Sequence, residues 1–373
     1  MSDGTPLLEL EDVEVHFNPG GMVRSLLSEQ TVRAVDGVDL TLEENDVIAL
    51  VGESGCGKTT LGKAAVGLQR PTGGDVNYRG QEIWEAKDSR DADIPWTEIR
   101  RSLQIIHQDP ASALNGSRRV RALLADPLKK WRTDLGPEER LETIYHYLEY
   151  VGMEPVEDYA DRYPHQLSGG EKQRVALGRA LLMNPDVILA DEAISALDVS
   201  LRVEMMDLII DLQGMFNTSY LFVSHDLANA RYLTKQAGGK IAVMYLGEIV
   251  EIGDPDDIVQ NPQHPYTKVL RWSMPPIDPD AAAKAVEEEP PIRKIDVPDP
   301  KDPPSGCKFH TRCPHAREAC TQEEPAHFET EYDTRVACFR QLDDHAYWDS
   351  PELEDEADGT DIGTDGEATA RGD

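Results

Sequence analysis

The sequence lacks the features of a membrane-spanning or secreted protein. No run of about 18 apolar residues occurs along the chain, so we expect no membrane-spanning segment. The opening residues, MSDGTPLLELEDVEV, contain no basic stretch followed by an apolar core, so we expect no secretory signal. We therefore expect the chain to stay in the cytoplasm.

Basic residues are scarce relative to acidic ones. The chain of 373 residues has 37 Lys and Arg against 70 Asp and Glu, a formal net charge of −33. A nucleic-acid partner held through its phosphates is not expected, because the field of the whole molecule would repel it. Hydrophobic residues make up 39%, so most of the chain can bury a core, and the length is typical of one large domain or of two to three ordinary ones.

The acidic residues are spread along the chain. Residues 341–373 hold 12 of them and one Arg, a net charge of −11 out of −33, so an acidic tail explains only a third. Lys is also rarer than Arg, 13 against 24. We favour a chain from a halophile, with its whole surface adapted to molar salt, where a screening length of about 3 Å makes self-repulsion small.

The pattern along residues 1–273 predicts an α/β fold. Alternating apolar and polar residues at 7–17 and 33–42 predict half-buried strands, and the apolar run at 47–51 predicts a strand buried on both faces. Further strands are expected at 187–190, 219–224, 240–245 and 248–252, and helices at 170–183, 199–215 and 226–236. This alternation predicts a mostly parallel sheet covered by helices.

One stretch departs from this alternation. Residues 110–166 have helical spacing and predict a helical insertion into the α/β core. We expect its helices to be broken at three prolines, Pro127, Pro137 and Pro155.

The composition changes near residue 274. Proline is frequent up to residue 305, which predicts a linker or an extended segment at 274–305. A compact cysteine-containing region is expected at 306–340. The acidic remainder, 341–373, is expected to be disordered.

A glycine-rich segment after the strand at 47–51 matches the phosphate-loop pattern G-x-x-x-x-G-K-[ST]. Its glycines let successive N–H groups point at a phosphate, and the following helix N-terminus adds a positive dipole end. Lys58 is expected to reach the β- and γ-phosphates and Thr59 to coordinate Mg²⁺. Cys56 fills space between glycines. We expect nucleotide binding by Gly52, Ser54, Gly55, Cys56, Gly57, Lys58, Thr59 and Thr60.

A second motif, LSGGE at residues 167–171, opens the helix after the insertion. The sequence here resembles the ATP-binding cassette (ABC) proteins. In that family the serine and glycines, here Ser168, Gly169 and Gly170, face the γ-phosphate of a nucleotide held by the opposite subunit. A simple capping box of Ser168 and Glu171 is the alternative, although it would not require two glycines, which weaken a helix.

The resemblance implies roles for residues outside these two motifs. After the strand at 187–190, Asp191 binds Mg²⁺ and Glu192 acts as the general base on water. Gln108 senses Mg²⁺ and water and contacts the membrane partner. The dimer-contact loop is 195–198, and His225 contacts the γ-phosphate. Catalysis of ATP hydrolysis is therefore assigned to Glu192, His225, Gln108 and Lys58.

Three further positions bear on this resemblance. Phe17, at the end of the first strand, is either the ring that stacks on adenine or a core residue. Ala193 and Ile194 stand where the family usually has Pro-Thr, and His107 stands where an aromatic residue is common. None of these departures removes a catalytic group.

Four longer stretches resemble the ATPase subunits of oligopeptide/dipeptide importers: VRAVDGV, QIIHQDP, MYLGEIVEIGDPDDI and NPQHPYTKVL. The stretch PTGGDVNYRG resembles the F-type ATPase of such paired systems. This resemblance implies import of peptides or related solutes by a peripheral subunit at the cytoplasmic face of the membrane. It also implies a second, non-identical ATPase, two transmembrane permease subunits and an external solute-binding protein.

Four of the five cysteines, Cys307, Cys313, Cys320 and Cys338, lie close together in sequence. Disulfides are disfavoured in a reducing cytoplasm, whereas four thiolates suit Zn²⁺ or a [4Fe–4S] cluster. No C-x-x-C pair is present, which argues against a zinc ribbon. The related importer ATPases carry an iron–sulfur cluster at similar cysteines, so we favour a cluster; zinc and unmetallated packing are the alternatives.

Two other functions are compatible with a cassette. One is a soluble ABC ATPase that acts on ribosomes or DNA damage, although such proteins usually carry two cassettes or long inserts. The other is a subunit with vestigial hydrolysis, against which the intact Lys58, Asp191 and Glu192 argue.

Overall fold

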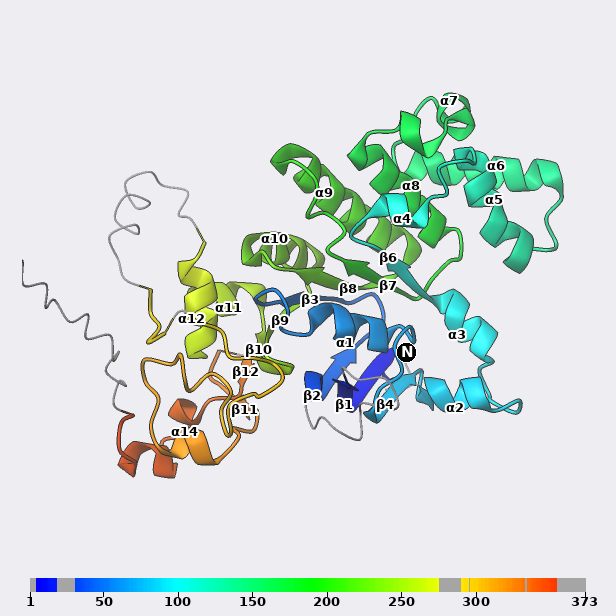
Figure 1. The fold of residues 1–373 in the computed structure, drawn as a ribbon. Coiled ribbons are helices and arrows are strands. Elements are labelled where there is room, and N and C mark those ends of the chain that lie inside the picture. The colour runs from blue at the N-terminus through cyan, green and yellow to red at the C-terminus, as the bar shows by residue number, and fades with distance from the viewer. Residues whose placement is uncertain (1–4, 19–30, 275–289, 295, 333, 354–373) are drawn as a thin grey trace, which may run out of the picture.

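The computed structural model describes residues 5–18, 31–274, 290–294, 296–332 and 334–353. Figure 1 shows a large sheet, a smaller sheet beside it and a group of helices beyond one edge of the large sheet. None of the helices in the described ranges is both long and apolar enough to cross a membrane.

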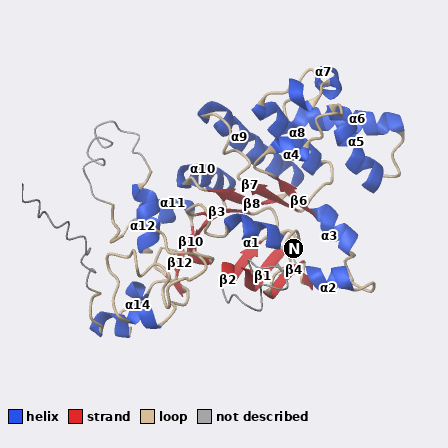
Figure 2. Ribbon diagram, viewed as in Figure 1, coloured by secondary structure: helices blue, strands red, loops and turns tan. Residues whose placement is uncertain are grey.

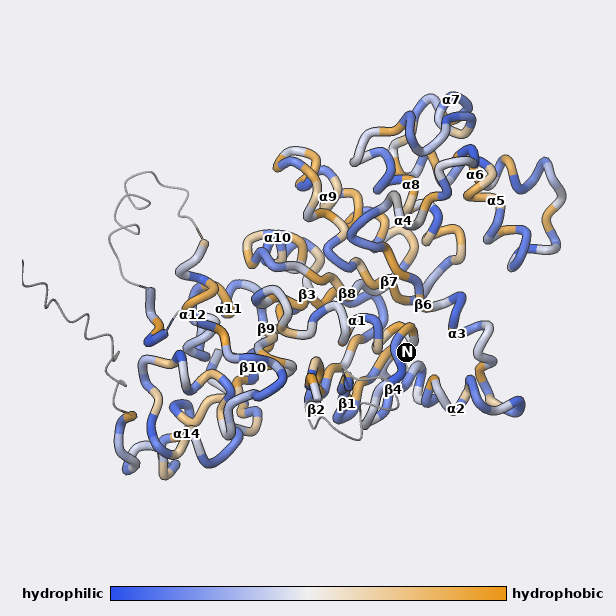
Figure 3. The backbone as a smooth tube through the Cα atoms, in the orientation of Figure 1, coloured by the Kyte–Doolittle hydropathy of each residue, from blue (hydrophilic) through white to orange (hydrophobic). Residues whose placement is uncertain are grey.

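Five parallel strands form the centre of the large sheet, in the order β9-β3-β8-β7-β6. All residues of β3, β7 and β8 are buried, because helices cover both faces, and these strands belong to the hydrophobic part of the tube in Figure 3. The five strands are β3 (Val47–Val51), β6 (Leu103–Ile106), β7 (Val187–Asp191), β8 (Ser219–Ser224) and β9 (Lys240–Tyr245). The predicted parallel sheet is confirmed.

An antiparallel sheet packs beside the first, with the strand order β2-β1-β4-β5. Its strands are β1 (Leu8–Phe17), β2 (Val32–Leu42), β4 (Gly73–Tyr78) and β5 (Gln81–Glu82). Helix α1 (Lys58–Ala65) contacts β1 and β2 of this sheet and β7 and β8 of the large one. The helix that follows the phosphate loop is therefore fixed between two sheets.

The helical group lies between β6 and α8 (Gly169–Leu181) and comprises α4 (Pro110–Ala113), α5 (Val120–Trp131), α6 (Pro137–Tyr150), α7 (Val156–Asp161) and η1 (Pro164–Gln166). Pro137 begins α6 and Pro155 precedes α7, as expected of helix boundaries. The predicted break at Pro127 is wrong, because Pro127 lies inside α5. Burial of Leu124 and Leu128 on the inner face of α5 stabilises the helix across the proline.

The remaining helices of this part are α2 (Ile83–Asp88), α3 (Trp96–Ser102), α9 (Val199–Phe216), α10 (Leu227–Ala237), α11 (Pro255–Gln260) and α12 (Pro265–Trp272). Figure 2 shows α9 and α10 on the side of the large sheet where the helical group lies. Asn217 and Gly238, with positive φ angles of 53° and 70°, end α9 and α10.

The C-terminal unit, here residues 306–353, extends the large sheet. Strand β12 (Thr334–Val336) pairs antiparallel with β10 (Glu248–Gly253), which pairs with β9, and β11 (Phe328–Glu329) pairs antiparallel with β12. The unit also contains α14 (Ala319–Gln322), η2 (Phe339–Gln341) and η3 (Ala346–Asp349). Phe309, Cys313 and Ala316 belong to the same hydrophobic core as the parallel strands. The unit is therefore continuous with the cassette.

The ordered chain continues beyond the boundary expected at residue 340. Tyr347 is 3% exposed, and its hydroxyl donates a hydrogen bond to the carbonyl of His315 over 2.7 Å. The Arg317 guanidinium lies 3.0 Å from the Glu352 carboxylate. Residues 341–353 therefore pack on the rest of the C-terminal unit, contrary to the expected disorder, because this acidic stretch contains an aromatic residue that is buried. Residues 275–289 of the expected linker and 354–373 of the expected tail lie outside the described residues.

Candidate nucleotide site

The phosphate loop connects β3 to α1 in a conformation that requires glycine. Gly52, Gly55 and Gly57 have φ angles of 156°, 83° and 109°. A Cβ atom would lie 2.1 Å from the carbonyl oxygen of Met244 at Gly52, and 2.0 Å from that of Ala34 at Gly57. At Gly55 it would meet no atom within 4 Å, so this part of the loop borders open space. The loop thus packs against the backbone at Gly52 and Gly57 and is open at Gly55, where a phosphate can approach.

Lys58 is buried inside its own loop. Its Nζ donates hydrogen bonds of 2.8 Å to the carbonyls of Gly52 and Glu53. The Cys56 thiol lies 3.7 Å from the same Nζ, and the side chain of Cys56 is buried, as expected of a small residue that fills space. A triphosphate in the loop would offer Lys58 phosphate oxygens in place of these carbonyls.

Thr59 and Asp191 come together although they are far apart in sequence. The Thr59 hydroxyl donates to an Asp191 carboxylate oxygen over 2.7 Å, and Asp191 is 6% exposed at the end of β7. A hydroxyl and a carboxylate oxygen side by side are ligands of the type that Mg²⁺ prefers. The residues present therefore fit a magnesium ion beside the phosphate loop. Thr60 follows Thr59 in the first turn of α1.

Three predicted residues meet at the Glu192 carboxylate. Gln108 Nε2 donates to Glu192 Oε2 over 2.9 Å, and His225 Nδ1 lies 3.9 Å from the same oxygen. Glu192 has a φ angle of 48°, which residues other than glycine rarely adopt, and its N–H donates to the carbonyl of Val223 over 3.1 Å. The two buried strands β7 and β8 thus hold this carboxylate in place.

The LSGGE motif forms the start of α8. The Ser168 hydroxyl accepts from the N–H of Glu171 over 3.2 Å, and the Glu171 carboxylate accepts from the N–H of Ser168 over 2.6 Å. This is the capping box considered as the alternative. The two glycines differ: Gly169 is exposed and a Cβ atom there would meet nothing within 4 Å, whereas Gly170 is buried and a Cβ atom there would lie 3.5 Å from Leu201. The capping box is therefore present, and the role of this motif toward a partner's nucleotide stays a prediction.

The residues after Glu192 connect β7 to α9. Ala193 and Ile194 are buried, so the two residues that depart from Pro-Thr have a packing role. The Ser195 hydroxyl donates to the carbonyl of Glu192 over 2.8 Å, and Asp198 caps α9. Val199, the next residue, is 74% exposed.

Phe17 lies at the end of β1 and is 42% exposed. It is therefore not a core residue, and its ring is accessible for stacking.

The four C-terminal cysteines are free thiols in this structure. Burial raises the pKa of Cys313 to about 12 and that of Cys338 to about 11, and the neighbouring thiols add to both shifts. Burial, with Cys338 and the other two thiols nearby, also raises the pKa of Cys307. Within the described part of the chain, no group of three or more His, Cys, Asp or Glu side chains is arranged to hold a metal ion.

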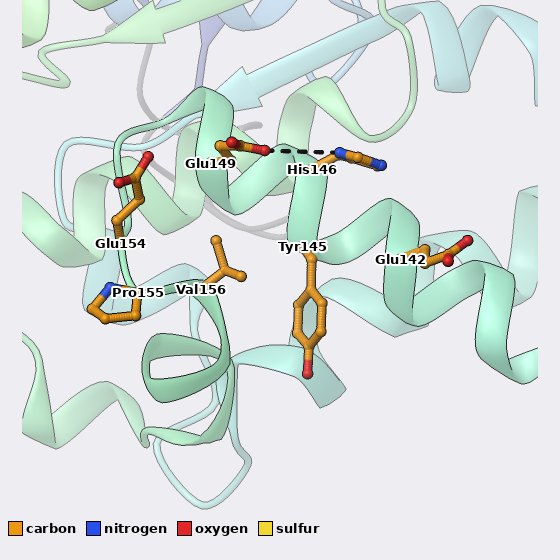
Figure 4. A pocket seen from close by; sticks show the side chains of 7 residues that line it. All are labelled: Glu142, Tyr145, His146, Glu149, Glu154, Pro155 and Val156. Atoms are coloured by element: carbon orange, nitrogen blue, oxygen red, sulfur yellow. Dashed lines mark ion pairs between the residues drawn. The ribbon is translucent and has the colours of Figure 1, made fainter.

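A cavity of about 690 Å³ lies elsewhere, on the helical group between α6 and α7 (Figure 4). Three carboxylates line it, those of Glu142, Glu149 and Glu154, and Glu149 lies 3.8 Å from His146. These acids would repel a triphosphate, so this cavity is not the nucleotide site.

Two residues near the phosphate loop, Arg312 and Lys308, belong to none of the sequence motifs and were not predicted. Arg312 forms two hydrogen bonds, of 2.9 and 3.0 Å, with the Glu53 carboxylate of the loop. Lys308 lies 2.7 Å from both Asp36 and Glu248. Burial acts to raise the pKa of Asp36, but Lys308, His16 and Arg33 together outweigh it, so the net pKa is lowered. The sequence held one indication of these contacts: two basic residues lie between Cys307 and Cys313 in a strongly acidic chain.

The fold and the loop define an ATPase of the ABC class. The ABC transporter family model matches residues 35–195, and the model of the oligopeptide/dipeptide transporter C-terminal region matches residues 250–320. A solved dimer of the ATP-binding cassette MJ0796, in a post-hydrolysis state with ADP and Pi, is 29% identical with a TM-score of 0.54. The match covers 65% of this chain and 96% of that one.

Similar proteins span almost the whole chain. The di/tripeptide transport ATP-binding protein DppF of Pseudomonas aeruginosa is 42% identical, over 79% of this chain and 86% of that protein. The oligopeptide transport ATP-binding protein AppF of Bacillus subtilis is 37% identical, over 89% of this chain and 96% of that protein. The chain belongs to the family of ATP-binding subunits of oligopeptide/dipeptide ABC transporters. The predicted fold, family and ATPase activity are confirmed.

Proposed function

We propose that this ATPase powers the import of dipeptides or oligopeptides. The match to the oligopeptide/dipeptide transporter C-terminal region supports this assignment, because that region lies outside the cassette that all ABC proteins share. The printed names of the relatives, di/tripeptide and oligopeptide transport ATP-binding proteins, point to the same solutes. The names DppF and AppF also support an F-type subunit.

We infer the roles of the residues from their contacts. Lys58 binds the β- and γ-phosphates from inside the loop, and Thr59 and Asp191 would hold Mg²⁺, which would supply positive charge to the phosphoryl group. Glu192 accepts a proton from the attacking water. Gln108 and His225 both border Glu192 Oε2, which supports their assignment to that water and to the γ-phosphate. Phe17 stacks on the adenine.

A second ATPase subunit completes the site in this proposal. Ser168 and Gly169 are exposed at the N-terminus of α8, where they are accessible to a nucleotide held by a partner. Val199, 74% exposed beside the loop from Ser195 to Asp198, supports a partner contact at that loop. The F-type resemblance favours a non-identical partner.

We place the subunit at the cytoplasmic face of the membrane, beneath two permease subunits that receive solute from an external binding protein. A groove of about 350 Å³ supports a docking position for a permease. It is lined by residues of β6, α5 and α8, among them Ile106, His107 and Trp131, and it adjoins Gln108. A movement of Gln108 would therefore displace residues that contact the docked permease.

Peptide uptake by reconstituted vesicles tests this function. Membranes that contain the permeases and both ATPases should accumulate labelled di- or oligopeptide only with ATP, and Glu192→Gln should abolish the accumulation. Glu142→Gln, an exposed substitution on α6, is the matched control. ATP hydrolysis that no peptide stimulates, together with no uptake, would reject peptide import while leaving the ATPase intact.

We also propose that the four cysteines hold a [4Fe–4S] cluster, with zinc as the alternative. The other three free thiols lie near enough to Cys307 to add to the rise that burial causes in its pKa, which supports a shared ligand. The unliganded side chains are not arranged for a metal, so binding requires their rotation and deprotonation. Anaerobic purification followed by iron, sulfide and zinc analysis tests this. Brown protein with about four irons per chain is expected, and colourless, iron-free protein would reject the cluster.

Adaptation to molar salt remains a proposal from the charge of −33. Thermal unfolding between 0.1 and 3 M KCl tests it, and a melting temperature that does not rise with salt would contradict it.

A further inference from the structure

The C-terminal unit reaches the phosphate loop through a buried arginine. The Arg312 side chain is 4% exposed and donates from Nη1 to Glu53 Oε2 over 2.9 Å and from Nη2 to Glu53 Oε1 over 3.0 Å. Its guanidinium carbon lies 5.8 Å from the ring centre of Tyr245 and 5.7 Å from that of Phe309. The two rings and the two-bond pairing fix the orientation of the guanidinium.

Glu53 connects this arginine to the nucleotide-binding lysine. It is the second residue of the loop, and its N–H donates to the hydroxyl of Tyr266 over 2.8 Å. Its carbonyl accepts from Lys58 Nζ over 2.8 Å. The side chain of Glu53 is therefore fixed by the C-terminal unit, its N–H by α12, and its carbonyl by Lys58.

A second basic residue anchors the same segment. The Lys308 side chain is 3% exposed and lies 2.7 Å from Asp36 and from Glu248. Gly247, next to Glu248, donates its N–H to the carbonyl of Cys56 over 2.9 Å. The segment from Cys307 to Cys313 thus has one buried cation bound to the loop and another bound to residues that support the loop.

We propose that Arg312 is a positioning residue for ATP binding: it holds Glu53 and neutralises its charge, so that the C-terminal unit sets the affinity of the phosphate loop for nucleotide. The proposal rests on the proposed nucleotide site. It goes beyond the roles in ATP binding and hydrolysis assigned above, which all belong to residues outside the C-terminal unit.

The electrostatics of the loop favour this role. A phosphate loop binds an anion, yet this loop contains a carboxylate one residue after Gly52. The paired guanidinium, whose side chain is 4% exposed, cancels that charge on a carboxylate whose side chain is 27% exposed. Without Arg312, the carboxylate would repel a triphosphate and would be free to leave the position that keeps the Glu53 N–H and carbonyl in place.

ATP binding and turnover by single and double variants of the full chain test the proposal. Arg312→Gln should raise the Kd and the KM for MgATP about tenfold, with kcat changed less than about twofold, because Glu192, Gln108 and His225 are untouched. In the Glu53→Gln background the same substitution should raise the Kd less than about threefold, since no carboxylate is left unpaired. Arg312→Lys, which keeps the charge but not the two-bond geometry, should fall between wild type and Arg312→Gln.

A matched control separates positioning from general damage to the unit. Arg317 belongs to the same unit and binds Glu352 and backbone carbonyls away from the loop. Arg317→Gln should leave the Kd for MgATP unchanged. If Arg317→Gln weakens binding as much as Arg312→Gln, or if Arg312→Gln acts equally in both backgrounds, the proposal is overturned.

The same binding assay distinguishes a failure of the positioning role of Arg312 from a failure of the proposed nucleotide site. Lys58→Ala should abolish binding, and failure of that variant to do so would reject the site. If Lys58→Ala abolishes binding and Arg312→Gln binds as wild type does, only the positioning role is rejected. If Arg312→Gln does not fold, Arg312→Lys and Glu53→Gln supply the comparison with wild type.

Discussion

The parallel core and the C-terminal unit are stabilised by different means. In the core, β3, β7 and β8 are buried along their whole lengths and are joined by regular backbone hydrogen bonds. The C-terminal unit has strands of two and three residues, short helices and long connections. Side-chain pairs between distant residues, such as Arg312 with Glu53, replace the regular bonds there.

This difference determines where the functional groups can be found. In the core they follow strand ends, because the carboxyl ends of parallel strands meet at one edge of a sheet. In the C-terminal unit they depend on which side chains are buried together. The two regions nevertheless share one hydrophobic core, so each is expected to affect the other.

The largest expected effect tests the chemistry assigned to the core. Glu192→Gln removes the base and should slow ATP turnover by roughly 10²–10⁴ while binding of MgATP is retained. Steady-state phosphate release and nucleotide binding measure the two quantities. Glu142→Gln is the control and should behave as wild type. Near-normal hydrolysis by Glu192→Gln would reject the assigned base.

A core substitution within the C-terminal unit tests whether the two regions unfold together. Phe309 is 1% exposed, and its ring centre lies 5.2 Å from that of Tyr245. Phe309→Ala should lower the free energy of unfolding by about 3–5 kcal/mol in the main urea transition.

Phe328→Ala, at a half-buried site in β11, is the control for Phe309→Ala and should cost less. A separate early transition in Phe309→Ala, with the main transition unchanged, would show that the C-terminal unit is an independent domain.

The sequence predicts the core well for a physical reason. Strand and helix positions from Val47 to Gly253 follow from apolar runs and glycine turns, which are local signals. The resemblance to ABC proteins placed Thr59 and Asp191 at one Mg²⁺ and Gln108 and Glu192 near one water, and the structure brings the members of each pair into hydrogen-bond contact. The persistence of α5 through Pro127 does not follow from local signals, because tertiary packing decides it.

The C-terminal unit was predictable only in outline. The four cysteines marked its position, but no local pattern indicates that Arg312 binds a residue 259 positions earlier in the chain. The prediction of disorder for residues 341–373 rested on their acidic composition. It missed the packing of the segment up to Leu353, in which Tyr347 is buried. Long-range side-chain pairs have no periodicity that a sequence can display.

The pH dependence of stability separates the two regions further. Burial raises the pKa of Glu248 from 4.5 to about 7; Lys308 opposes the shift, and Glu324 and Asp36 add to it. Because the folded state then binds the additional proton, stability should fall as pH rises from about 4.5 to about 7. Glu248→Gln should remove about 3 kcal/mol of this decline, measured by urea unfolding across that range.

Lys308 keeps Asp36 as a partner in the Glu248→Gln variant, which limits the damage from the substitution. The exposed Glu329→Gln is the control and should retain the wild-type dependence on pH. Identical pH profiles for wild type and Glu248→Gln would contradict the buried-carboxyl account.

The smallest effect concerns the segment beyond residue 340. Tyr347→Phe removes the hydrogen bond to the His315 carbonyl and should lower the free energy of unfolding by about 1 kcal/mol. Trp348→Phe, at a 45% exposed ring, is the comparison and should change stability less. Equal stability of Tyr347→Phe and wild type would mean that this segment does not stabilise the unit.

The affinity of Lys58→Ala for MgATP, measured by calorimetry beside wild type, tests the central assignment most directly. The loop from Gly52 to Thr59 is the only phosphate cradle that this account uses, and Lys58 is its one buried cation that can reach the triphosphate. Loss of measurable binding by Lys58→Ala, in a protein that unfolds as wild type does, is the predicted result. Binding of MgATP as tight as that of wild type would contradict the account.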